Sequence, residues 1–439
     1  MKATPPAGFT PEIFIKELKA AMEFVERRVI NRSEVVEQIF LALLLGEHVL
    51  IESRTGVGKT LLAGQVFAMF NGARTFKVQA SKEQQPDTYF GGLDIEELKK
   101  GRIIHNTEGS LIESEFGFID EIFDANDYTL RALLTTLNER ALVRGIQQMP
   151  AAIHTVIAAT NYLRISEITE ALLDRFLFKA LTTPDKDPFI QYQISEQYLR
   201  ASGNILQPQK KISYEWLKYA SCIVKGEIED RTITLSPEIL YFTNLVIRHY
   251  EVQRNRMMQE RPHEERARQK DFYISPRTQA KALDLVRGLA FLKGRTAVDK
   301  SDVSRLNYLL CTSGIPSERA LFQKSYETLS HLYGASGGFE QLAQMLMLEE
   351  ILRRFKNDPS LLKKPIAELE GIQAKRSLIS WAKETFGSAD ADIEEKKRTT
   401  ERFLSQIQPV TEDLKQLKTH LEKEIKSVFG SEGEPFGGN

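Results

Sequence analysis

One octapeptide decides the fold, and it reads Ser53-Arg54-Thr55-Gly56-Val57-Gly58-Lys59-Thr60. Residues 48–52 before it (HVLIE) are β-rich, and residues 61–67 after it (LLAGQVF) continue as an amphipathic helix. A glycine-rich turn between a strand and a helix can hold phosphate, because its backbone N–H groups and the positive helix end face the anion. We expect residues 55–60 to wrap a β-phosphate, Lys59 to bridge the β- and γ-phosphates, and Thr60 to hold Mg²⁺. The octapeptide therefore predicts a nucleoside triphosphate site.

The octapeptide departs from the usual phosphate-loop pattern at one position. G-x-x-x-x-G-K-[ST] begins with glycine, whereas this chain has Ser53. Serine adopts most turn geometries unless φ is positive, and Gly56 and Gly58 remain where the backbone approaches the phosphates. A surface Gly-Lys-Thr turn is the alternative interpretation, and the flanking strand and helix favour the phosphate loop.

A second polar motif ends a later apolar strand. Residues 115–121 (EFGFIDE) close with Asp120 and Glu121. A carboxylate at a strand's carboxyl end can hold Mg²⁺ beside Thr60, and the next glutamate can act as general base on an attacking water. Such a pair alone is usually a solvated strand end. Together with the phosphate loop it predicts a catalytic centre.

Two weaker signals follow along the chain. Asn161 comes after a β-rich run at residues 153–159 and could orient the lytic water. Arg175 closes the helical segment at residues 171–176 (ALLDRF). Each is ambiguous alone, because an asparagine at a strand end is often a turn residue and an Asp-Arg pair is often a surface ion pair.

A later segment predicts a helix start that presents another arginine. Ser275 would be the N-cap and Pro276 the first helical residue, so Arg277 would project from the first turn. The alternative is an arginine that forms a salt bridge within the helix start.

This ordered series resembles the AAA+ ATPases, specifically the MoxR family, and within it the regulatory ATPase variant A (RavA) branch. The resemblance spans residues 29–310 and rests on residues 90–93 (FGGL), 118–122 (FIDEI), 137–140 (LNER) and 173–176 (LDRF). It makes residues 53–60 Walker A, Asp120 and Glu121 Walker B, Asn161 sensor 1, Arg175 the arginine finger and Arg277 sensor 2. Asn31-Arg32 departs from the family, where Gly-Gln is usual.

The resemblance implies an ATPase that uses ATP and Mg²⁺ and assembles into a ring, expected to be a hexamer. Arg175 is placed to reach a neighbouring subunit's nucleotide, where a trans arginine contributes roughly 10³-fold or more to hydrolysis. The implied work is that of a chaperone or remodelling motor that matures or activates a protein client. The implied partner is a von Willebrand factor A (vWA) domain protein with a metal-ion-dependent adhesion site.

Composition predicts a cytoplasmic protein. The chain has 439 residues, 42% hydrophobic, so it can bury at least two cores. Its 59 basic and 60 acidic residues give a net charge of -1, which disfavours nucleic acid as a partner. Cys222 and Cys311 lack the spacing of a zinc site or a disulfide framework. No apolar stretch is long enough to cross a bilayer, and residues 1–6 lack the apolar core of a secretory signal.

The pattern along the chain predicts an α/β fold in three parts. Residues 1–184 form the AAA+ nucleotide-binding core, residues 185–334 an all-α lid, and residues 335–439 a helical extension with a disordered tail. The core begins with a helix at 11–29, and its five strands are expected at 49–52, 75–79, 116–120, 155–159 and 176–180. Strands separated by helices imply a parallel sheet with the ligand beyond the strands' carboxyl ends.

Three segments lie outside this scheme. Residues 88–110 are expected to form a hairpin or loop insert that faces the ring's pore in the resembled family, or else a plain solvated loop. Residues 253–270 are expected to be a solvated helix or mobile loop. A heptad-like stripe runs through Phe403, Ile407, Val410, Leu414, Leu417 and Leu421. Pro409 would kink that helix or begin it, and an intramolecular hairpin against 342–352 or 378–386 is favoured over a coiled coil with another protein.

The sequence is compatible with two other functions. One is a nucleic-acid-dependent AAA+ motor or loader, although the near-neutral charge and the absence of a recognised helix-turn-helix count against it. The chain could also be a nucleotide-gated scaffold without catalysis, with Ser53 marking weakened turnover.

Overall fold

The computed structural model describes residues 4–54, 56, 58–102, 104–144, 147–162, 167–201, 205–259, 273–311, 316–335, 337–363 and 393–430. The chain divides into two compact units. One comprises Met1–Thr234, Asp271–Val298 and Ser304–Phe322; the other comprises Leu235–Lys270, Asp299–Val303 and Gln323–Asn439. Because these units interleave along the chain, the division at residues 184 and 334 stays a prediction. The predictions for residues 260–270, 378–386 and 431–439 concern segments outside the described residues.

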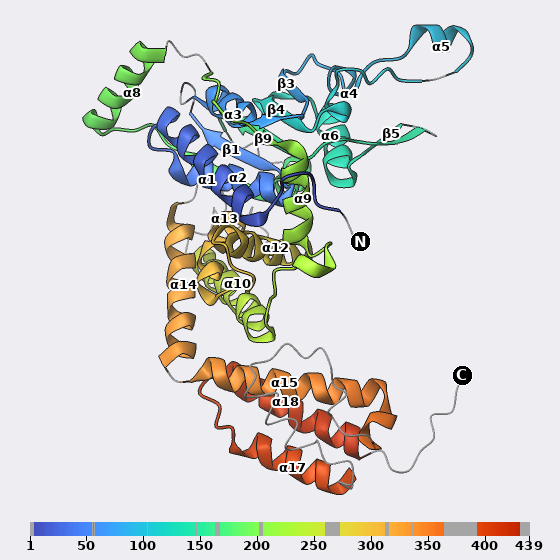
Figure 1. Cartoon of the computed structure of the whole chain (residues 1–439), viewed down its shortest axis with the longest axis vertical. Helices are drawn as coiled ribbons and strands as arrows, with labels where there is room; N and C mark the ends of the chain where they lie inside the picture. The colour runs from blue at the N-terminus through green and yellow to red at the C-terminus, as the bar shows by residue number, and fades with distance from the viewer. Residues whose placement is uncertain are drawn as a thin grey trace. The chain divides into compact units, whose positions relative to one another are not determined.

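A five-stranded parallel sheet forms the centre of the first unit (Figure 1). Its strands are β1 (Val49–Ser53), β3 (Thr75–Gln79), β4 (Phe116–Asp120), β7 (Thr155–Thr160) and β8 (Phe178–Thr182), in the order β3-β4-β7-β1-β8. The predicted sheet is confirmed. The last strand was expected two residues too early, because Phe176 still donates its N–H to Leu172 in the last turn of the preceding helix.

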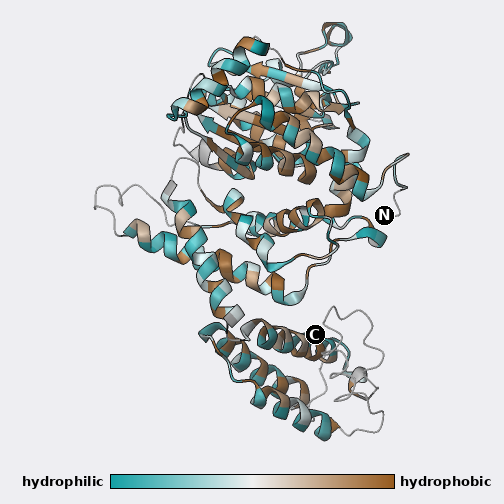
Figure 2. Cartoon of the chain, turned by 60° about the vertical axis from the view of Figure 1, so that its left-hand side comes forward, coloured by the Kyte–Doolittle hydropathy of each residue, from teal (hydrophilic) through white to brown (hydrophobic). Residues whose placement is uncertain are grey.

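All five strands run in the same direction, so their carboxyl ends share one edge of the sheet. Glu52 pairs with Thr160, Ser53 with Thr182, and Gln79 with Asp120. Figure 2 shows hydrophobic residues gathered in the strands of this unit. Except for the edge strand β3, the strands are thus largely buried, and polar side chains begin where they end.

Helices join and flank the strands. They are α1 (Pro11–Arg28), α2 (Ser33–Leu45), α3 (Lys59–Ala68), α6 (Asp127–Glu139) and α7 (Glu167–Arg175). Thr10 caps α1 through its side chain, as Asn126 caps α6. Leu130, Leu133 and Leu137 recur at helical spacing and are buried in the core, so α6 packs one apolar face against it.

Several small elements were not predicted. A two-stranded antiparallel hairpin follows α6, formed by β5 (Ala141–Arg144) and β6 (Gln147–Pro150). A second, parallel pair joins β2 (Phe70–Asn71) to β9 (Ile212–Ser213). The insert between β3 and β4 holds α4 (Asp87–Phe90) and α5 (Ile95–Lys99), and Leu93 bridges His105 across its base. Short 3₁₀ turns are η1 (Leu111–Glu113), η2 (Ile122–Asp124), η3 (Glu229–Arg231), η4 (Lys300–Leu306) and η5 (Pro359–Lys363).

The chain after the sheet is helical, as predicted. Its helices are α8 (Pro188–Ala201), α9 (Tyr214–Lys225), α10 (Pro237–Gln259), α12 (Pro276–Leu292), α13 (Asn307–Leu310) and α14 (Pro316–Ala335). Ser275 caps α12 by accepting the N–H of Thr278 at 3.2 Å, and Pro276 begins the helix. Within the first unit, α12 packs on α2 and α9.

The second unit contains α15 (Gly338–Asn357), α17 (Ile393–Gln406) and α18 (Glu412–Phe429). The heptad-like stripe does not form one helix: α17 ends at Gln406 and α18 begins after its N-cap Thr411. Both interpretations of Pro409 were therefore wrong, since it lies between the helices. The loop is held by Gln341, whose amide donates to the Gln408 carbonyl at 2.8 Å. The packing of α18 on α15 confirms the intramolecular hairpin against 342–352.

Among the residues that the structure describes, no helix is both long and apolar enough to cross a membrane.

Candidate active site

The phosphate-loop segment lies between β1 and α3 at the carboxyl edge of the sheet. Gly56 and Gly58 both have φ of +83°, and a Cβ added at either would meet no atom within 4 Å. Glycine is thus required there by backbone conformation rather than by space. Ser53 is the last residue of β1 and does not have positive φ, so serine fits this position without strain. Thr55 and Val57 lie outside the described residues.

Lys59, Glu121 and Asn161 meet at this edge. Lys59 Nζ donates to Asn161 Oδ1 at 2.6 Å and to Glu121 Oε1 at 3.3 Å. The side chains of Lys59 and Glu121 are only 7% and 14% exposed. Glu121 lies 62 residues after Lys59 in the sequence, and Asn161 lies 102 residues after it. The structure brings the three side chains together, as the topology of a parallel sheet predicts.

Both carboxylate oxygens of Glu121 accept hydrogen bonds from Asn161. Its Oε1 accepts from Asn161 Nδ2 at 2.5 Å, and its Oε2 accepts from the Asn161 backbone N–H at 3.1 Å. Its backbone is left-handed, with φ of 52°, which costs about 1–3 kcal/mol in a residue other than glycine. Backbone strain of this kind concentrates at functional sites, and here it turns the carboxylate toward β7.

Thr60 and Asp120 supply adjacent oxygens beside this cluster. The Thr60 hydroxyl donates to Asp120 Oδ2 at 3.2 Å, and Asp120 Oδ1 accepts the Glu121 N–H at 3.1 Å. Hydroxyl and carboxylate oxygens are the ligands that Mg²⁺ prefers, so these residues fit the expected ion.

The Asn31-Arg32 departure has a structural explanation. Asn31 has φ of 56°, in the region that glycine and asparagine adopt most readily. Its Nδ2 donates to Asp185 Oδ1 at 2.5 Å, and Arg32 Nη1 lies 2.8 Å from Asp185 Oδ2. Asparagine thus fits a left-handed position where glycine would also fit, and it adds a link to the segment after β8.

Arg175 and Arg277 are held by partners of their own. Arg175 Nη1 donates to Asp174 Oδ2 at 2.8 Å, while Ser275 Oγ donates to Asp174 Oδ1 at 3.2 Å. Arg277 Nη1 donates to Asn138 Oδ1 at 2.5 Å. The carboxylate of Asp174 therefore joins the end of α7 to the cap of the helix that carries Arg277. Sequence reasoning considered Asp174 only as an ion-pair partner of Arg175, which the structure shows, and did not single out Asn138.

These two arginines lie at the opposite edge of the sheet from Lys59. Phe178, three residues after Arg175, donates its N–H to the carbonyl of His48 just before β1, and Lys281 lies 2.7 Å from Glu47. With about 3.3 Å per residue, five-residue β1 separates its two ends by roughly 16 Å. Arg277 therefore lies at the far end of β1 from the phosphate loop of its own chain.

A buried polar cluster supports this amino edge. Arg140 has φ of 49° and donates to the carbonyls of Gly46, Ile153 and His154. Burial, with Arg140 nearby, lowers the pKa of His48 to about 3, and burial lowers that of His154 to about 4. Both imidazoles are neutral at pH 7, so the cluster holds the strands in place without carrying titratable chemistry.

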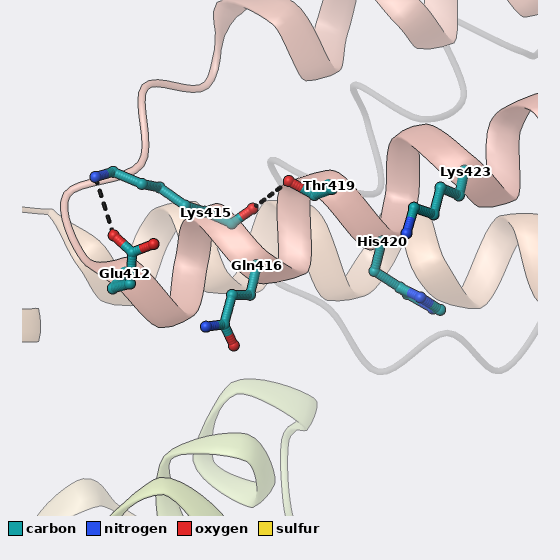
Figure 3. Close-up of a pocket in the computed structure, with 6 residues that line it drawn as sticks. All are labelled: Glu412, Lys415, Gln416, Thr419, His420 and Lys423. Atoms are coloured by element: carbon teal, nitrogen blue, oxygen red, sulfur yellow. Dashed lines mark hydrogen bonds and ion pairs between the residues drawn. The ribbon is translucent and has the colours of Figure 1, made fainter.

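A surface hollow in the second unit has a different character (Figure 3). It is lined by one face of α18, through Glu412, Lys415, Gln416, Thr419, His420 and Lys423. Lys415 pairs with Glu412 at 3.1 Å, and nothing in this solvated face indicates a ligand.

Comparison with protein families supports the same fold. A family model described as the MoxR domain in the MoxR-vWA-beta-propeller ternary systems matches residues 16–211. A second, described as an AAA lid domain, matches residues 251–319.

Individual relatives are distant. The uncharacterized protein MJ0812 of Methanocaldococcus jannaschii is 23% identical over 93% of this chain and 100% of its own length. The chaperone MoxR1 of Mycobacterium tuberculosis is 26% identical over 47% of this chain and 57% of its length.

A crystal structure from Cytophaga hutchinsonii, described as a candidate ATPase, shares the fold with a TM-score of 0.56. It is 17% identical, and the match covers 73% of this chain and 94% of that one. Because the two family models follow one another along the sheet and the helices after it, this chain belongs to the MoxR family of AAA+ ATPases.

Proposed function

We propose that this chain hydrolyses ATP in a ring of identical subunits and uses the energy to remodel a protein client. The observation that carries the proposal is the contact of Lys59 with Glu121 and Asn161 beside the Thr60–Asp120 pair. An ammonium group, a carboxylate base and an amide converge where the phosphate loop would present a γ-phosphate.

The residues take separate roles in this reaction. Lys59 contacts the β- and γ-phosphates of ATP, and Glu121 accepts a proton from the attacking water, which Asn161 orients. Thr60 and Asp120 would hold Mg²⁺, whose charge would offset that of the phosphates. In the structure Lys59 is bonded to Glu121 and Asn161, so a γ-phosphate that takes over the Lys59 donors would leave the Glu121 carboxylate available to water.

Both arginines act on the neighbouring subunit in this proposal. An arginine side chain spans about half of the roughly 16 Å between the edges of the sheet, so neither reaches its own phosphate loop along β1. Arg175 and Arg277 are joined through Asp174 and Ser275 and would approach the neighbour's γ-phosphate together. Hydrolysis therefore requires assembly, and the resemblance favours a hexamer.

The client side rests on family evidence. The matching family model is named for systems that combine MoxR, vWA and beta-propeller proteins, and MoxR1 is named as a chaperone. We therefore propose a vWA-domain protein as partner and a protein complex as client. Assignment to the RavA branch is part of the same proposal.

Steady-state Mg²⁺-ATPase assays of the full chain test this function. Glu121→Gln should bind ATP and lose at least about 10²-fold in kcat, and Arg175→Ala should behave likewise. Arg398→Ala is the matched control, because it removes an exposed arginine that pairs with Glu394 in α17. Its activity should be unchanged. Activity per subunit that is independent of protein concentration would contradict the ring.

A further inference from the structure

Helix α8 is exposed along its length. From Pro188 to Arg200 every side chain is exposed or half-buried. Its large apolar side chains have high exposed fractions: Phe189 63%, Tyr192 61%, Ile194 42%, Tyr198 63% and Leu199 81%. A helix of 14 residues is marginally stable in water without packing of an apolar face. The described residues of its own chain bury none of these side chains.

Polar contacts nevertheless fix α8 to the first unit. Gln191 donates its amide to the Asp185 carbonyl at 2.9 Å, and Gln197 donates to the Arg27 carbonyl at 2.5 Å. Asp185 is itself bound by Arg32 and Asn31. Figure 1 shows α8 projecting beside α1, on the side of the unit away from α5. The apolar side chains are therefore presented at a defined place.

We propose that α8 packs against a second copy of this chain, on the face that carries Arg277. The five exposed apolar side chains offer on the order of 600 Å², since a large aromatic side chain carries about 150–250 Å². A stable protein interface takes about 800 Å² from each partner, so α8 supplies most of one half.

The topology indicates which face of the second copy receives α8. β8 ends at Thr182, paired with Ser53 of β1, so α8 begins at the phosphate-loop edge. If arginines act in trans, the neighbour's arginine edge must approach this same edge. That edge carries an aromatic side chain of its own, Tyr273, which is 67% exposed and lies four residues before Arg277. The contact is heterologous, as ring closure requires.

Composition disfavours a lipid surface as the occupant. Helices that lie on membranes carry lysine and arginine along their polar face. The charged residues of α8 are Glu196 and Arg200, which form an ion pair at 2.6 Å. The helix therefore has no net positive charge that would attract anionic lipid, which favours a protein partner for its apolar side chains.

Assembly of the full chain tests the contact without relying on turnover. Tyr192→Ser with Leu199→Ser, in the hydrolysis-impaired Glu121→Gln background with ATP, should raise the protein concentration for half-maximal assembly about tenfold or more. Sedimentation velocity measures this shift. Ile13→Ser, at a 43% exposed position of α1, is the matched control and should leave assembly unchanged. Equal assembly of the double variant and its parent would overturn the proposal.

Cross-linking tests the receiving face. With Cys222 replaced by alanine, a mixture of Leu199→Cys and Tyr273→Cys chains should give a linked dimer with a short bismaleimide. Linkage in Leu199→Cys alone would show pairing of α8 with α8 and contradict the proposed face. Loss of flotation with anionic vesicles, rather than loss of assembly, in the double serine variant would assign α8 to a membrane and overturn the proposal.

The orientation of this contact rests on the proposed trans mechanism, and the two can fail separately. A wild-type chain that neither assembles nor hydrolyses ATP contradicts both. A wild-type chain that hydrolyses ATP cooperatively, with an unaffected α8 variant, contradicts only the α8 contact.

Discussion

Lys59 donates a hydrogen bond to Asn161 at 2.6 Å and so joins the start of α3 to the end of β7. Asn161 also donates to Glu121, which connects the phosphate-binding cation to the carboxylate that would activate water. These contacts define a centre in which one amide is bonded to both charged groups.

Replacement of Asn161 tests its role as the residue that orients water. Asn161→Ala should lower kcat about 10²-fold while the affinity for ATP stays within a few-fold, because Lys59 and the loop backbone remain. Single-turnover hydrolysis and equilibrium titration with ATP separate the two effects. Asn244→Ala, an exposed asparagine of α10, is the control. An equal loss of ATP affinity would indicate a structural role instead.

Asp174 should act as a positioning residue for the trans arginines. Asp174→Asn keeps an oxygen that can accept from Ser275 but loses the ion pair with Arg175, so kcat should fall about tenfold with unchanged ATP affinity. In an Arg175→Ala background the same substitution should have little further effect. Additive losses would show that Asp174 acts independently of Arg175.

Replacement of Asn31 tests whether its left-handed backbone and its bond to Asp185 explain why asparagine is found there. Asn31→Ala should lower the free energy of unfolding by about 1–2 kcal/mol, because alanine is strained at φ of 56° and the bond to Asp185 is lost. Asn31→Gly loses the bond but not the conformation, so its loss should be smaller. Urea unfolding of the three chains gives the order. An Asn31→Gly chain as unstable as the Asn31→Ala chain would contradict the argument from backbone conformation.

Stability should fall as the pH drops below about 6.5. His48 and His154 have folded pKa values of about 3 and about 4, below the unfolded value of 6.5. Between these values the unfolded chain binds more protons, so each histidine costs roughly 2 kcal/mol of stability at pH 5 relative to pH 7.5. Urea midpoints at the two pH values measure this. His48→Gln should reduce the difference, whereas His331→Gln, at an exposed position, should not.

The strands and the catalytic cluster could be predicted because they depend on local pattern. Residues 49–52 and 116–120 are short apolar runs, and the parallel order that follows brings Lys59, Glu121 and Asn161 to one edge. The pairing of β5 with β6 could not, because residues 141–150 show no strong alternation of apolar and polar side chains. The heptad-like spacing of residues 403–421 wrongly predicted one continuous helix. The apolar residues belong to two helices and to the loop that joins them.

Arg277 shows a different limit of sequence reasoning. Its helix start was predicted correctly from Ser275 and Pro276, which act locally. Its place at the amino edge depends on packing of α12 against α2 and on the Lys281–Glu47 ion pair, both between residues more than 200 apart. Local capping chemistry carries no information about which edge of the sheet a helix will meet.

Complementation between two inactive variants tests the central proposal most directly. Lys59→Ala removes the phosphate contact but keeps the arginines, and Arg175→Ala keeps the phosphate contact but lacks the finger. If each active centre combines residues of two chains, an equal mixture should recover about a quarter of wild-type ATPase activity, since one interface in four pairs two intact halves. Mixed rings that show no more activity than the separate variants would contradict catalysis across the subunit boundary.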